Sequence, residues 1–522
     1  MGVQEKNYYL HPFINYLKSR LESLLSLVQL EEEGQVIEPD SFVLKNLSAW
    51  SFEKYTNIFD SLGSPSGHCN LRCKFCYEVG NPLAFEKTCL TIQEASTRIS
   101  YYRHDVQKGL PLFKTRLYME PFTNRDLFPI LRMVRAADRE VEIQLTTNGS
   151  YLSLDVLEQL AELVPINICV SLNSSNPETR RNIMGDSNSK ASIKMIEKFK
   201  SYNLPFVGTI VAWPDIESSE LIDTIRYLDQ NLARAIRITL PGYSKYFSTA
   251  IPFNTKEVWD KVLSDVLPLR NEIQTPILVL PSLYHSKALL PEVAGVIKES
   301  PATQAGIQFG DLIKSINGEN VYTRSGAKKI LGRCHNNPGL HITIERNGKL
   351  FELELMEKGA KEGYYPYRPA GYPASMANPF GIVLIDDYDP AWLWKVLNRI
   401  IDIKAKHVLL MTSVIMEPLV AALLESIPEL DNLLGETNLY LWVPEQRFWG
   451  GNIILGDLYT CSDYLQAVYD FQQKRGIKPD LIILPNSFSP NKNNDLLGIS
   501  YSSIELVTGI PVELADCTNI TI

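Results

Sequence analysis

The segment Gly67-His-Cys-Asn-Leu-Arg-Cys-Lys-Phe-Cys-Tyr77 contains three cysteines separated by three and then two residues. On a short loop this spacing lets three thiolates converge on three irons of a [4Fe–4S] cube, whereas a closed metal site needs four protein ligands. The segment therefore predicts that Cys69, Cys73 and Cys76 bind an iron–sulfur cluster, and that one iron is left open for chemistry.

Two other interpretations of these cysteines remain open at this point. One is a zinc site with His68 or Cys89 as a fourth ligand, although the adjacency of His68 and Cys69 makes ligation of one ion by both awkward. The other is that the thiols are small apolar side chains of a core. The remaining cysteines are scattered and are predicted to be mostly structural: Cys89, Cys169, Cys334, Cys461 and Cys517.

Strand-like and helix-like segments alternate from about residue 60 to about residue 240. A first strand leads into the cysteine loop, and further apolar runs follow at Arg116–Met119, Val141–Thr146, Ile166–Leu172, Phe206–Trp213 and Ala235–Leu240. Helical patterns lie near 92–103, 124–136, 154–163, 189–202 and 217–229. Six β/α repeats predict an incomplete (β/α)6 barrel, in which active sites lie at the carboxyl ends of the strands.

Phe75, directly before the third cysteine, completes a pattern that resembles the signature of the radical S-adenosylmethionine (SAM) superfamily. The resemblance implies that SAM binds the open iron through its amino and carboxylate groups. It also implies that one electron from the cluster cleaves SAM, and that the resulting 5′-deoxyadenosyl radical abstracts hydrogen from a substrate. The cofactors implied are a [4Fe–4S] cluster and SAM, which supply the chemistry while the protein supplies placement.

Residues at three strand ends resemble the SAM-binding motifs of that superfamily. Glu120 follows Tyr118 and Met119, where the family usually has two glycines, and the resemblance implies that Glu120 accepts hydrogen bonds from the SAM ammonium. Thr147 ends the third strand in Thr146-Thr147-Asn148-Gly149, whose Asn-Gly pair also fits an ordinary turn.

The fourth strand and the helix after it supply further candidates. Ser171 and Asn173 stand where relatives bind the SAM carboxylate or ribose. In the segment Asn176–Gly185, Arg180 or Arg181 is positioned to pair with the SAM carboxylate, and at least one of the two is expected to be an exposed helix arginine. The full set of expected SAM contacts is Phe75, Glu120, Thr147, Ser171, Asn173 and Arg180.

Residues 276–358 have a different character and resemble a PDZ domain of bacterial type, most clearly over Val293–Val321. Gly306 and Gly310 fit tight backbone positions, and Asn317-Gly318 fits a hairpin turn. A PDZ domain often binds a chain end by strand addition. Covering the active site or acting as a scaffold is an equally open role.

The remaining segments complete the predicted domain order. Residues 1–60 are expected to be a helical extension with an amphipathic helix at 11–31, and 61–275 the barrel. Residues 359–379 read as a Pro/Gly/Tyr-rich linker, and 380–522 as an α/β domain with strands at Gly381–Ile385, His407–Thr412, Leu439–Val443 and Leu481–Leu484. Arg447–Tyr459 and Pro479–Pro485 resemble the uncharacterised C-terminal domain of iron–sulfur oxidoreductases that join radical SAM and PDZ modules.

Composition limits the partners and the compartment. The formal net charge of −9, with 45% apolar and 21% charged residues, is ordinary for a globular protein and disfavours nucleic acid as a partner. No secretory signal or membrane span is visible, so a cytoplasmic location is expected.

The leading expectation is a radical SAM enzyme that acts on a small molecule or a peptide and receives electrons from a reductant such as ferredoxin or flavodoxin. The other hypothesis is a PDZ-containing adaptor protein with a structural metal.

Overall fold

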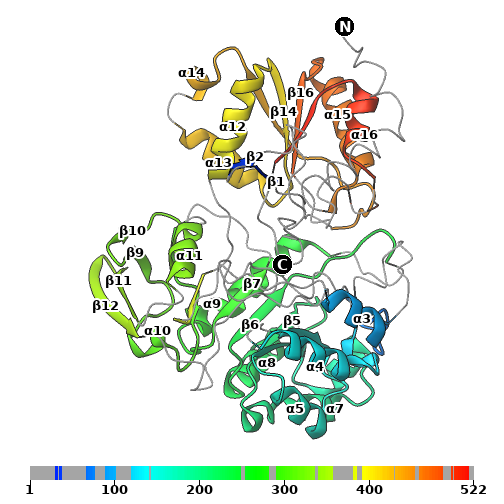
Figure 1. Cartoon of the computed structure of the whole chain (residues 1–522), viewed down its shortest axis with the longest axis vertical. Helices are drawn as coiled ribbons and strands as arrows, with labels where there is room; N and C mark the ends of the chain where they lie inside the picture. Colours follow the sequence, from blue (N-terminus) through cyan, green and yellow to red (C-terminus); the bar gives the residue numbers. More distant parts are fainter. Residues whose placement is uncertain are drawn as a thin grey trace. The chain divides into compact units, whose positions relative to one another are not determined.

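The computed structural model divides the chain into two compact units (Figure 1). One unit consists mainly of residues 54–282 and 289–387, and the other mainly of residues 388–520 together with residues 1–53. We call them the 54–387 unit and the 388–520 unit. The structure describes residues 30–32, 35–37, 66–76, 89–100, 119–139, 143–247, 253–280, 290–334, 339–356, 380–384, 391–427, 430–452, 458–485, 495, 497 and 499–515.

A five-stranded parallel sheet with strand order β3-β4-β5-β6-β7 forms the centre of the first part of the 54–387 unit (Figure 1). The strands are β3 (Ile143–Thr147), β4 (Ile166–Ser171), β5 (Phe206–Val211), β6 (Ala235–Thr239) and β7 (Ile277–Leu280). The helical elements around them are α3 (Ile92–Ile99), η7 (Pro121–Thr123), α4 (Leu127–Ala137), α5 (Leu154–Ala161), α6 (Pro177–Met184), α7 (Ser189–Ile196), η8 (Phe199–Tyr202), α8 (Ser218–Gln230) and α9 (Thr255–Leu269).

The α/β class and the alternation of strands and helices are confirmed from β3 to β6. The predicted first strand and nearly all of the predicted second strand, Arg116–Met119, lie outside the described residues. β7 is a strand that the sequence did not predict, and it pairs in parallel with β6. The sheet therefore continues beyond residue 275, where the barrel was expected to end.

Helix capping and close packing explain how these elements form. The Asn176 side chain accepts hydrogen bonds from the first turn of α6, Pro177 supplies the first helical residue, and Gly185 ends the helix at φ +71°. Gly208 in β5 faces α8, because a β-carbon there would lie only 2.5 Å from a Leu228 methyl carbon. The face of the sheet that carries Gly208 is thus the helix-covered face, and we call the opposite one the inner face.

The PDZ-like part of the 54–387 unit contains a four-stranded antiparallel sheet with order β10-β9-β11-β12. Its elements are β8 (Gly295–Val296), α10 (Pro301–Gln304), β9 (Leu312–Ile316), β10 (Glu319–Asn320), α11 (Arg324–Arg333), β11 (Gly339–Arg346) and β12 (Lys349–Met356). Asn317 and Gly318 have φ values of +49° and +80° in the turn between β9 and β10, which confirms the predicted hairpin.

A strand from beyond the predicted linker completes the PDZ-like core. β13 (Ile382–Val383) pairs antiparallel with β8, and Phe380, Ile382 and Leu384 are buried in the same core as α11. The prediction that 381–385 belongs to the C-terminal α/β domain is therefore wrong, because strand pairing across a long chain separation leaves no trace in local periodicity. The linker 359–379 itself lies outside the described residues.

The PDZ-like part packs on the inner face of the parallel sheet. Near the amino ends of β5, β6 and β7, the side chains of Val207, Ala235 and Leu278 form one buried cluster with Ala294, Ile297 and Val383. A salt bridge of 2.7 Å between Lys298 Nζ and Asp229 Oδ1 adds a polar contact. The PDZ-like part therefore closes the inner face at the end opposite the strands' carboxyl ends.

The 388–520 unit contains a second parallel sheet, with order β15-β14-β16-β17. The strands are β15 (Asn438–Trp442), β14 (His407–Met411), β16 (Leu481–Pro485) and β17 (Val512–Ala515), and the helices are α12 (Ala391–Ile403), α13 (Glu417–Ser426), α14 (Leu430–Leu434), α15 (Cys461–Arg475) and α16 (Ser502–Thr508). Three of these strands were predicted, so the α/β character of this region is confirmed.

The described part of the N-terminal extension is a hairpin of β1 (Leu30–Glu32) and β2 (Gln35–Ile37). Residues 30 and 31 are thus strand rather than the end of the predicted helix, of which the rest lies outside the described residues. Among the described helices, none combines the length and the apolar composition that crossing a membrane requires.

Candidate radical SAM site

The cysteine loop is fixed to the end of α6 by backbone hydrogen bonds. Arg72 N donates to the Met184 carbonyl at 3.1 Å, and Lys74 N donates to the Ile183 carbonyl at 2.8 Å. The loop also bonds to the Glu120 backbone, whose N–H donates to the His68 carbonyl at 2.9 Å. Three predicted parts of the site, namely the cysteine loop, the Glu120 strand end and the helix after β4, are therefore brought together.

The three thiols lie close enough to influence one another. Burial, and to a smaller extent the neighbouring Cys76 and Cys69, raises the pKa of the Cys73 thiol to about 12. Asn148 Nδ2 lies 3.7 Å from Cys69 Sγ, at hydrogen-bonding distance for sulfur. Three partly exposed thiols on one loop suit the thiolate chemistry of an iron–sulfur cluster.

Of the alternative fourth ligands, Cys89 has a described neighbour in Ser66. Cys89 Sγ lies 3.7 Å from Ser66 Oγ. Across the described ranges, no three His, Cys, Asp or Glu side chains are gathered around a position for a single metal ion. This holds for Cys69, Cys73 and Cys76 as well, so it does not distinguish a zinc site from an iron–sulfur site.

Glu120 lies at the centre of a hydrogen-bond network at the strand ends. Its carboxylate accepts from Thr147 Oγ1 at 2.7 Å and from Asn148 N at 2.7 Å, and the side chain is almost fully buried. Burial raises the pKa of Glu120 to about 7, and the hydrogen bonds from Asn148, Thr147 and Phe122 oppose that increase. A buried carboxyl group that can change charge near neutral pH is suited to holding a cation.

Arg180 is placed differently from what the resemblance implied. Its Nε donates to Asp186 Oδ2 at 2.8 Å, and Nη1 donates to the carbonyls of Ser171 and Leu172 at 2.9 and 2.7 Å. Nη2 donates to the carbonyl of Asn148. Only 1% of the Arg180 surface is exposed, and the hydrogen bonds given above use most of its N–H donors. This geometry does not favour the expected pairing with the SAM carboxylate, and it ties β3, β4 and α6 together.

Asp186, the buried partner of Arg180, is not among the residues predicted from the sequence. It follows the helix-ending Gly185, and its carboxylate forms an ion pair of 2.8 Å with Arg180. One signal for it was present, namely a carboxylate placed six residues after an arginine across a helix end. Local sequence cannot show that both groups turn inward.

Asn173 and Ser171 both lie at the end of β4 but have different roles in the fold. Asn173 has φ +61° and is buried, its Oδ1 accepts from Val211 N at 2.8 Å, and its Nδ2 lies 3.3 Å from the Met184 sulfur. The polar atoms of its side chain thus bond to residues of β5 and α6. Ser171 is partly exposed, and its hydroxyl accepts from Thr209 Oγ1 at 3.2 Å.

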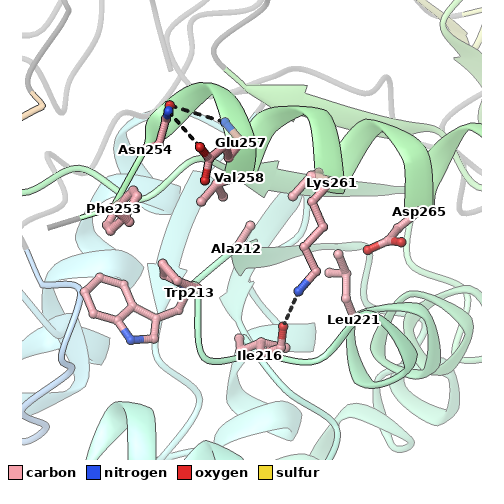
Figure 2. A pocket seen from close by; sticks show the side chains of 12 residues that line it. Ala212, Trp213, Ile216, Leu221, Phe253, Asn254, Glu257, Val258, Lys261 and Asp265 are labelled. Carbon is pink, nitrogen blue, oxygen red and sulfur yellow. Dashed lines mark hydrogen bonds between the residues drawn. The ribbon is translucent and has the colours of Figure 1, made fainter. Parts of the chain in front are cut away.

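Phe75 connects the cysteine loop to the end of β5. Its ring centroid lies 6.4 Å from that of Trp213. Trp213 also lies on the wall of a cavity of about 250 Å³ between the β5 loop and α9 (Figure 2). Two polar groups of this cavity stabilise the fold, because Asn254 caps α9 and Lys261 Nζ donates to the Ile216 carbonyl at 3.2 Å. The lining also includes Asp265, whose Oδ2 is buried and has no hydrogen-bond partner among the described residues.

Comparison with known proteins agrees with this arrangement. Residues 64–228 match the radical SAM superfamily and residues 292–343 match the PDZ domain. GTP 3′,8-cyclase of Aquifex aeolicus is 28% identical over 178 residues, covering 33% of this chain and 53% of the relative. Zinc metalloprotease RasP of Shouchella clausii is 28% identical over 261 residues, covering 48% of this chain and 54% of the relative. The chain thus spans about half the length of these curated relatives.

Among solved structures, Streptococcus suis SuiB bound to S-adenosylmethionine is 15% identical, with a TM-score of 0.33, and the match covers 55% of this chain and 70% of SuiB. HydG of Carboxydothermus hydrogenoformans is 14% identical, with a TM-score of 0.31, and covers 51% of this chain and 66% of HydG. The cysteine loop and the two family matches support the same domain assignment: the chain contains a radical SAM domain, matched over residues 64–228, and a PDZ domain, matched over residues 292–343.

Proposed function

We propose that the chain cleaves SAM reductively and abstracts hydrogen from a substrate, with a [4Fe–4S] cluster bound by Cys69, Cys73 and Cys76. The observation that carries this proposal is the anchoring of one three-thiol loop beside the buried carboxylate of Glu120. When bound, the cluster supplies one electron to SAM. The protein's part is to hold SAM at one iron, to orient it and to exclude water.

The network around Glu120 suggests how the protein orients SAM. Glu120, held by Thr147 and the Asn148 N–H, would accept a hydrogen bond from the SAM ammonium. Phe75 and the partly exposed Ser171 would contact other parts of SAM. Arg180 and Asn173 would act as positioning residues, because their polar atoms bond to the strand ends that carry the contacts.

The substrate in this proposal is a small molecule or a peptide, and the electron donor is a protein such as ferredoxin or flavodoxin. A PDZ domain as part of the same compact unit makes a peptide a reasonable substrate, since strand addition is a known way for such domains to bind chain ends.

Anaerobic reconstitution with iron and sulfide provides the direct test. The reconstituted chain, given SAM and dithionite, should release 5′-deoxyadenosine, measured by mass spectrometry. Cys73→Ala should lose both iron and SAM cleavage, because a cube with two protein ligands is labile. Cys89→Ala is the matched control and should keep both.

Two results would contradict the proposal. One is a chain with full iron content that does not cleave SAM. The other is one zinc and no iron per chain after anaerobic purification, which would favour the adaptor protein with a structural metal.

A further inference from the structure

The inner face of the parallel sheet is buried at one end and accessible at the other. In β4 and β5 the last residues alternate between buried and partly exposed, and in β6 the partly exposed positions are Arg237 and Thr239. Ser171 and Thr209 are partly exposed opposite the helix-covered face marked by Gly208, and Cys169 is partly exposed at the border of the apolar cluster, against which it packs. At the other end, Val207 and Ala235 are covered by the PDZ-like part. Among the described residues, the inner face is therefore partly exposed toward the strands' carboxyl ends and has an apolar floor.

Arg237 lies in the middle of this accessible half. It lies near the Cys169 thiol: burial raises the pKa of that thiol, and the Arg237 guanidinium and the Thr146 side chain oppose the increase. Within the described residues, no Asp or Glu forms an ion pair with Arg237. Arg180 and Arg346 of the same unit differ in this respect, since Arg180 pairs with Asp186 and Arg346 with Asp311. Burying part of a cation without an anionic partner lowers the stability of the folded protein, unless a bound ligand supplies the negative charge.

A line of polar groups connects Arg237 to the candidate SAM site. Arg237 is paired with Thr209 on the neighbouring strand, and Thr209 Oγ1 donates to Ser171 Oγ at 3.2 Å. The Ser171 carbonyl accepts in turn from Arg180. Arg237 is two residues before the end of β6, which places it about 7 Å below the strand ends at the usual rise per residue. A molecule bound at Arg237 would thus extend toward the site where SAM is proposed to bind.

We infer that Arg237, together with Cys169 and Thr209, binds a carboxylate group of the substrate on the inner face of the sheet. A guanidinium is planar and matches the two oxygens of a carboxylate, and its single charge balances one negative charge. A phosphate monoester, which carries nearly two charges at neutral pH, would keep a charge unbalanced here. The inference rests on the proposed function, and it names the substrate class as a carboxylic acid.

Alkylation of Cys169 tests the site without SAM cleavage. The reconstituted full-length protein is treated with iodoacetate, which carries a carboxylate, or with neutral iodoacetamide, and modification of Cys169 is followed by peptide mass spectrometry. For each thiol, the rate of modification by iodoacetate is divided by the rate of modification by iodoacetamide. If Arg237 binds carboxylates, this ratio should be about tenfold higher at Cys169 than for free glutathione, because one charge-assisted contact supplies a factor of about that size. Acetate should slow the iodoacetate reaction.

Three variants make the result decisive. Arg237→Gln should reduce the ratio at Cys169 to that of glutathione, and Arg237→Lys, which keeps the charge but not the planar fork, should give an intermediate ratio. Arg226→Gln removes an exposed arginine of α8 that pairs with Glu272 and should change nothing. A wild-type ratio equal to that of glutathione, a ratio unaffected by Arg237→Gln, or stronger protection by phosphate than by acetate would overturn the inference. Alkylation of Cys169 needs no SAM turnover. A failure of the proposed function would appear in the SAM cleavage assay, and a failure of this inference would appear in the alkylation rates.

Discussion

At Glu120, burial and hydrogen bonding act on the carboxyl charge in opposite directions. Burial has the larger effect and raises the pKa to about 7, while the bonds from Asn148 and Thr147 favour the ionised form. The sequence predicted that Glu120 belongs to the site, because the residue resembles a family motif. It could not predict the titration near neutral pH, which depends on burial by segments distant in the chain.

The affinity for SAM should therefore depend on pH. Protonation of Glu120 below pH 7 removes the charge that attracts the SAM ammonium, so the affinity should decrease as pH falls, by up to about tenfold per pH unit well below the pKa. Equilibrium binding of SAM to reconstituted protein at pH 6 and pH 8 measures this. Glu120→Gln should bind SAM weakly at both values. An equal pH dependence in wild type and Glu120→Gln would assign the titration to another group.

Arg180 shows where residue-level prediction fails. A helix arginine near the SAM carboxylate and a buried arginine that binds backbone carbonyls have the same local sequence, and only the fold distinguishes them. Its bonds to Asp186, Ser171, Leu172 and Asn148 make it a positioning residue.

Arg180→Met should destabilise the chain strongly. It leaves Asp186 buried without its cation, which typically costs about 3–5 kcal/mol of unfolding free energy. The adjacent Arg181, which is exposed, is the matched control, and Arg181→Met should cost less than about 0.5 kcal/mol. Urea unfolding of the two variants measures the difference. Equal stability of both would mean that the Arg180 network contributes little.

At the level of elements, prediction succeeded where burial alone defines the strand. β3, β4, β5 and β6 were located to within a few residues, because strands covered on the helix side of a parallel sheet form apolar runs. β13 was predicted as a strand but assigned to the wrong sheet. Apolar content reveals that a segment is buried, but the choice of partner strand depends on tertiary packing.

Removal of the Phe380 side chain should weaken the PDZ-like core. Phe380 is fully buried beside β13, so Phe380→Ala should cost about 3–5 kcal/mol. Phe351 on β12 is 39% exposed and serves as a control, for which Phe351→Ala should cost about 1 kcal/mol or less. Chemical unfolding followed by hydrogen exchange in residues 290–356 reports on this core. Little loss of protection in Phe380→Ala would show that β13 is not part of it.

At the scale of the whole molecule, the PDZ-like part belongs to the same compact unit as the parallel sheet. Covering the active site was one of the roles that the sequence left open for this part. The contacts of Val383, Ala294 and Ile297 instead place the PDZ-like part at the floor of the inner face, opposite the strand ends.

Truncated chains should show whether iron binding and thermal stability depend on the residues that cover the inner face. A chain ending at residue 387 keeps β13 and should bind as much iron as the full chain. A chain ending at 358 loses Val383 from the floor and Phe380 and Ile382 from the PDZ-like core, so it should unfold at lower temperature and bind less iron. Thermal unfolding and iron analysis compare the two. Equal behaviour would show that the floor is dispensable.

The central claim is that three thiolates hold a cluster whose fourth iron is open to SAM. Mössbauer spectroscopy of the ⁵⁷Fe-reconstituted protein tests it most directly, since each iron of the cube contributes separately to the spectrum. Because Cys69, Cys73 and Cys76 supply only three ligands, addition of SAM should shift about one quarter of the cluster signal and leave the rest unchanged. A spectrum unaffected by SAM, with all irons equally ligated, would contradict the account.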